Sequence, residues 1–272
     1  MNKTPLIAII ISIVAVVGIY FFMDIKPSKN NTTKTNVNQE IVENQEIISA
    51  FNKTLAPEIQ QNLNRWLANA EDNKDTLALD SLINQYESLQ QYNFSAYYHT
   101  LKAEIQNTKE SWALAGDRQY KVSQNTAYDS TFNHILLDKS IDSYNKAIEF
   151  DKTDLDLKTK LGEAYMMNAE QPMQGITILL DVVKQDSMNI NANLALGKFG
   201  IVSGQYDKAL NRLEKVLSLQ PENKEALLLA AEAATNIGDL PYAIDKLERS
   251  KELIEDEAFK KDIDLLIEQL KK

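Results

Sequence analysis

The chain has 272 residues with 29 lysines and arginines against 39 aspartates and glutamates, which gives a formal net charge of −10 at pH 7. This acidic balance argues against a general nucleic-acid binder, because such a protein needs a basic face. The absence of cysteine excludes disulfides, thiolate nucleophiles, zinc–thiolate sites and iron–sulfur clusters.

Residues 6–23 (LIAIIISIVAVVGIYFFM) contain no charged side chain. As a helix they would be roughly 27 Å long at about 1.5 Å per residue, just enough to cross the hydrocarbon core of a bilayer. The stretch ends in bulky residues and has no small-residue cleavage site, which favours an uncleaved anchor over a cleaved signal peptide. We therefore expect residues 1–23 to be an N-terminal tail and a transmembrane signal anchor.

Residues 24–38 consist largely of Asn, Thr, Lys, Ser and Pro, a composition that predicts a flexible linker. The positive charges around residues 6–23 do not favour a cytoplasmic N-terminus. A very short N-terminal tail before a large C-terminal domain does fit the usual signal-anchor arrangement. We expect a single-pass membrane protein with its domain outside the cytoplasm, which in a bacterium means an inner-membrane protein with a periplasmic domain.

From residue 39 onward the apolar residues recur at intervals of three and four, which predicts helices, and sustained alternation typical of strands is missing. We expect a helical region at 39–108 that contains a degenerate repeat near Leu82, Tyr86 and Ala96. Pro57 is expected to begin one of its helices. Residues 257–272 predict a C-terminal capping helix, apolar on one face only.

An internal repeat organises the second half. Leu196-Gly197, Gly204 and Ala209 return 34 residues later as Ala230-Ala231, Gly238 and Ala243. This pattern resembles the tetratricopeptide repeat (TPR), whose period is about 34 residues. The residues that match its small and large signature positions are Gly162, Tyr165, Gly197, Tyr206, Ala209, Pro221, Gly238 and Ala243.

The resemblance implies an all-α fold, a TPR-type α-α superhelix (solenoid) in which each helix pair covers the apolar face of the next. We expect three repeats over 155–256 and a TPR-like repeat with an insertion at 109–154. In the latter, residues 124–137 are expected to form a long loop that contains His134.

In this family, positions on the first helix of each repeat line a concave, protein-binding groove. The resemblance places the following residues there: Thr159, Glu163, Met166, Leu194, Lys198, Ile201, Leu228, Glu232 and Thr235. The Lys and Asn that hold a peptide C-terminal carboxylate in some TPR domains are absent, since Thr159 and Glu163 stand at those positions. The expected groove is apolar with an acidic fringe, suited to an apolar and basic polypeptide segment.

Sites for chemistry are not expected. His99 and His134 have neither a nucleophile motif nor a metal partner at i+4, so no enzyme activity, cofactor or metal site is predicted. The run Asp151, Asp154 and Asp156 lacks the spacing of a calcium loop, and Asp154 is expected to cap a helix instead. Trp66 and Trp112 are expected to be packing anchors.

The leading hypothesis is a membrane-anchored TPR scaffold that mediates protein–protein interaction at the cell envelope, in assembly or secretion. Its plan is similar to that of single-span bacterial TPR proteins such as ancillary translocon subunits and cytochrome c maturation factors. Two alternatives stay open at this stage: a structural oligomerisation subunit that uses the N-terminal helices, and a small-ligand sensor at residues 124–137.

Overall fold

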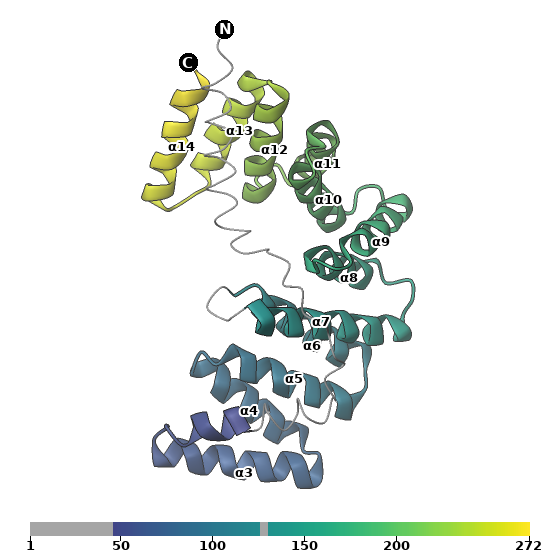
Figure 1. Cartoon of the computed structure of the whole chain (residues 1–272), viewed down its shortest axis with the longest axis vertical. Coiled ribbons are helices and arrows are strands. Elements are labelled where there is room, and N and C mark those ends of the chain that lie inside the picture. Colours follow the sequence, from purple (N-terminus) through teal and green to yellow (C-terminus); the bar gives the residue numbers. More distant parts are fainter. Residues whose placement is uncertain (1–45, 126–129) are drawn as a thin grey trace. The chain divides into compact units, whose positions relative to one another are not determined.

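The structure is a computed structural model that describes residues 46–125 and 130–272, and all regular structure in these ranges is helical (Figure 1). A short helix covers residues 46–52. The helices that follow are α3 (Pro57–Asn73), α4 (Thr76–Ser88), α5 (Tyr92–Gln106), α6 (Lys109–Ser123), α7 (Ser130–Phe150), α8 (Leu155–Met167), α9 (Pro172–Gln185), α10 (Ile190–Val202), α11 (Tyr206–Leu219), α12 (Lys224–Ile237), α13 (Leu240–Glu252) and α14 (Glu257–Leu270).

The described helices form two compact units, one within Lys26–Glu170 and the other comprising Gln171–Lys272. In the first unit α3 to α8 each pack against their chain neighbours, and in the second unit α9 to α14 do the same (Figure 1). The all-α, TPR-like stacking of helix pairs is thereby confirmed in each unit. The boundary falls inside segment 155–256, which the sequence predicts as three consecutive repeats.

The predicted anchor at 6–23 and linker at 24–38 lie outside the described residues. Among the helices that the structure describes, none combines the length and the apolar character needed to cross a membrane.

Asp and Asn side chains cap the first helix of each repeat in the segment 155–256. The side chains of Asp154, Asn189 and Asn223 each accept a hydrogen bond from the backbone N–H three residues ahead, at 2.9–3.0 Å. Asp256 caps α14 in the same way. These bonds satisfy amide groups that a helix start leaves free, and they confirm Asp154 as a cap.

Small residues allow the two helices of a pair to approach closely. A Cβ at Gly116 would lie 2.7 Å from the Tyr144 ring, and one at Gly197 would lie 2.9 Å from Leu213. At Gly200 the obstacle is the Ala209 Cβ at 2.9 Å and its backbone at 3.2 Å. The repeat pattern in the sequence does not single out Gly200, although it makes the contact with the least room to adjust.

The aromatic residues of the first unit build the core beneath the degenerate repeat. Tyr86 is fully buried, stacks on Tyr98 at 5.4 Å and meets the edge of Phe94 at 5.4 Å. Its hydroxyl donates to Asn52 Oδ1 at 3.1 Å, which ties α4 to the helix at 46–52. The buried aromatic contacts explain why this region is ordered despite its weak repeat signature.

The expected loop at 124–137 is wrong for most of its length. Helix α7 begins at Ser130 and runs for 21 residues, so His134 lies on a helix. Leu136 is buried in a cluster with Ala96 and Val122, and this burial gives the additional turns an apolar contact that stabilises them as helix. The hypothesis of a ligand-binding loop loses most of the segment on which it was based.

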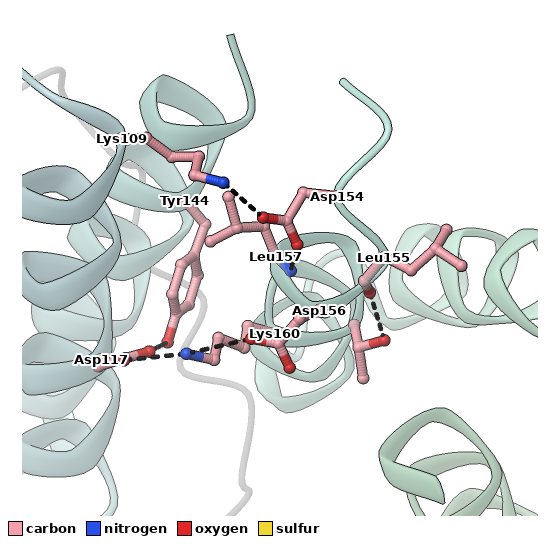
Figure 2. A network of polar contacts seen from close by, with 9 residues as sticks. Lys109, Asp117, Tyr144, Asp154, Leu155, Asp156, Leu157 and Lys160 are labelled. Atoms are coloured by element: carbon pink, nitrogen blue, oxygen red, sulfur yellow. Dashed lines mark hydrogen bonds and ion pairs between the residues drawn. The ribbon is translucent and has the colours of Figure 1, made fainter. Parts of the chain in front are cut away.

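A network of polar contacts joins α6, α7 and α8 in the first unit (Figure 2). Asp117 accepts from the Tyr144 hydroxyl at 2.9 Å and from Lys160 Nζ at 3.0 Å. Lys109 Nζ lies 3.1 Å from Asp154, the residue that caps α8. The network therefore fixes the start and the middle of α8 against α6.

Candidate functional site

Six of the nine predicted groove residues lie in the second unit, three on α10 and three on α12. Because Asn189 and Asn223 cap these helices at equivalent points, the helices share one register. Counted from the first helical residue, the ninth position is Lys198 in α10 and Glu232 in α12. In α14 the ninth position is Leu265.

The apolar members of the set are partly used by the fold. Leu194 is half-buried against the cluster that joins α10 to α13, and Leu228 is half-buried against a second cluster that includes residues of α12, α13 and α14. Ile201 is only 8% exposed, so it belongs to the interior and does not line an accessible surface. Its neighbour Val202, at the end of α10, is 61% exposed and lines the accessible surface.

The polar members differ in how well they are partnered. Lys198 Nζ forms an ion pair of 2.6 Å with Glu225 of α12, which links the two first helices. The Thr235 hydroxyl donates to the Ala231 carbonyl at 2.8 Å within α12. Both side chains therefore already have a partner within the second unit.

Glu232 is half-buried on α12, and its carboxylate makes no ion pair or side-chain hydrogen bond with any part of the chain that the structure describes. Burial raises the pKa of this carboxyl from 4.5 to about 7. Glu225, two turns earlier on the same helix, has a lysine partner and Glu232 has none. Glu232 is therefore the unusual charge on this surface.

The family model described as tetratricopeptide repeat covers α11 to α13 and the adjoining residues. Residues 202–258 match the TPR. Among solved structures, PilW, described as a widely conserved type IV pilus biogenesis factor, aligns at 15% identity with a TM-score of 0.53. The alignment covers 70% of this chain and 87% of PilW.

A second similar structure is TTC0263, a thermophilic TPR protein of Thermus thermophilus. It aligns at 17% identity over 70% of this chain and 95% of its own, with a TM-score of 0.50. At such identities the likeness shows the TPR-type fold and nothing finer. A comparison with curated protein sequences gives no match.

The remaining three predicted groove residues belong to α8 in the first unit. Thr159 is 1% exposed and its hydroxyl donates to the Leu155 carbonyl at 2.7 Å, so it is an interior residue of the TPR-like fold. Glu163 and Met166 are half-buried, while Met167 beside them is 44% exposed. Of the three residues predicted on α8, Glu163 and Met166 are partly exposed and Thr159 is not.

Another cluster of titratable groups lies between α4, α5 and α6, around His99. Its Nε2 is 3.9 Å from Glu87 Oε1 and makes no hydrogen bond within the described residues. Burial and the nearby Arg118 lower the pKa of His99 to about 4, which leaves the imidazole neutral at pH 7. The described residues contain no group of acidic or histidine side chains arranged to hold a metal ion.

The tryptophans pack as expected. Trp112 is buried, its Nε1 donates to Asn107 Oδ1 at 2.9 Å, and Lys146 Nζ lies 3.9 Å from the ring centroid. Trp66 packs at the edge of the aromatic core of the first unit. Neither ring is presented as a platform for a ligand.

Proposed function

We propose that this protein is a non-enzymatic TPR scaffold that binds polypeptide segments on the first-helix surface of its repeats. The observation that carries the proposal is the common register of α10 and α12. This register places half-exposed Leu194 and Leu228 at corresponding positions, with unpaired Glu232 one turn after Leu228 and exposed Val202 two turns after Leu194. A surface that mixes apolar and acidic groups suits an apolar and basic segment.

The proposal extends to the membrane through residues 6–23, whose composition supports a single transmembrane anchor with the domain on the far side. In a bacterium, this arrangement would place the repeats in the periplasm beside secreted or assembling polypeptides. A role in assembly or secretion at the cell envelope follows from that location.

The test is crosslinking and recovery of partners from native membranes with a variant that leaves the core intact. We expect Val202→Asp to reduce partner recovery strongly, because Val202 is exposed on a first helix. The matched control is Leu219→Asp, which places the same charge at an exposed apolar position of the second helix α11 and should leave recovery unchanged.

Circular dichroism should show both variants folded. If Val202→Asp recovers every partner and deletion of residues 39–110 abolishes recovery, the first-helix surface is not the binding site. The oligomerisation role of the N-terminal helices would then be the better account.

A further inference from the structure

Resting on the proposed function, we infer that Glu232 is the acceptor for a lysine or arginine side chain of the bound polypeptide. The carboxylate is half-buried on α12 and has no cationic partner among the described residues. An ionised carboxylate removed from water costs free energy unless a charge or hydrogen-bond donor compensates it. A lysine or arginine of the bound polypeptide would supply the compensating charge that no described residue provides.

Four basic side chains on the helices packed against α12 have partners other than Glu232, and no charged group contributes to the raised pKa of Glu232. Lys198 of α10 pairs with Glu225, and Arg212 of α11 donates to Asn193 at 3.2 Å. On α13, Lys246 pairs with Asp245 at 2.7 Å, and Arg249 donates to the Pro221 carbonyl at 2.9 Å.

The neighbouring positions add an apolar element to the recognition. Leu265 stands at the ninth position of α14, as Glu232 does in α12, and is 57% exposed. Leu228, one turn before Glu232 on α12, is half-exposed. A segment with a basic side chain next to apolar residues satisfies both the carboxylate and this apolar surface.

Proton binding supplies a second signature of the contact. Because burial holds the pKa of Glu232 at about 7, the carboxyl is largely protonated below neutral pH and ionised above it. A cation binds the ionised form, so affinity for a basic segment should rise as pH increases through 7. This pH dependence should disappear when the carboxyl is replaced.

The experiment pans a random peptide library displayed on phage against the immobilised full chain. Wild type should select peptides that carry Lys or Arg beside apolar residues. Glu232→Gln should lose the basic preference and bind the selected lysine peptides about tenfold more weakly, since a hydrogen bond to a charged group is lost. Glu222→Gln, an exposed glutamate before α12, removes the same charge and should behave as wild type.

Failure of this inference is distinguishable from failure of the proposed function. If wild type selects apolar peptides without a basic residue, or Glu232→Gln keeps the lysine preference, the role of Glu232 is overturned while peptide binding stands. If Val202→Asp binds every peptide that wild type selects, the first-helix surface is not a peptide site and both proposals fall.

Discussion

Glu232 shows how a single half-buried charge links stability to binding. The folded-state pKa of about 7 lies above the ordinary 4.5. Between these values the folded chain keeps a proton that the unfolded chain has lost, so stability falls as pH rises through that window. Above pH 7 the ionised carboxylate therefore destabilises the free protein, and a cationic partner would reverse this cost.

We expect Glu232→Gln to raise the unfolding free energy at pH 8 by roughly 1–3 kcal/mol, and so to raise the thermal midpoint. At pH 4 the substitution should change the midpoint little, because the carboxyl is then protonated in the folded chain. The measurement is thermal denaturation by circular dichroism across this pH range. Glu222→Gln serves as the control and should follow wild type at every pH. Equal stabilisation by Glu232→Gln at pH 4 and pH 8 would show that the carboxyl is not buried in the way described.

At the scale of single residues, the sequence predicts where a residue lies in the repeat better than it predicts how deeply its side chain is buried or what it contacts. The repeat register identifies Thr159 and Ile201 as groove residues, yet both are buried. Helical periodicity gives the direction of a side chain on its own helix, but burial depends on which neighbouring residues fill the space. The unpaired state of Glu232 is invisible in the sequence for the same reason, because partners from other helices decide it.

Among the elements, α7 departs most from the sequence-based expectation. The TPR period leaves residues 124–137 surplus and so predicts a loop, whereas the structure places residues 130–137 at the start of a 21-residue helix. The buried contact of Leu136 with Ala96 and Val122 supplies the stabilisation. Tertiary contacts of this kind override local periodicity and are not readable from one sequence.

The close contact between α10 and α11 makes a prediction at the same scale. We expect Gly200→Ala to destabilise the protein by about 1–3 kcal/mol, because its Cβ would meet the backbone and Cβ of Ala209, which cannot rotate away. Gly197→Ala should cost less, since its obstacle is the flexible Leu213 side chain. Urea denaturation of the two variants measures the difference, and a larger loss for Gly197→Ala would contradict this account.

For the molecule as a whole, the repeat period is sufficient to predict an all-α TPR-like fold, which the described helices confirm. The superhelical curvature and the membrane anchor remain predictions from the sequence. Small residues at Gly197 and Gly238 and caps at Asn189 and Asn223 mark the same two hairpins, and such agreement between local signals makes a fold predictable.

The anchor leads to a prediction about localisation. The full chain should sediment with membranes and require detergent for release, because about 18 apolar residues at 6–23 suffice to span a bilayer. A variant that lacks residues 1–38 should stay in the supernatant. Fractionation with and without detergent measures this, and protease added to intact spheroplasts should digest the region 39–272. A full chain that stays soluble would refute the anchor, and complete protection would refute the orientation.

The recurring Asx caps at Asp154, Asn189, Asn223 and Asp256 have an evolutionary consequence. Each hairpin brings its own start signal and shares none of it with the next. A gene segment that encodes residues 190–223 could therefore be duplicated or excised in one event, and the first helix of each remaining hairpin would still begin on an Asx cap. A lineage could lengthen or shorten its binding surface by whole hairpins, without new substitutions at the helix starts that connect them.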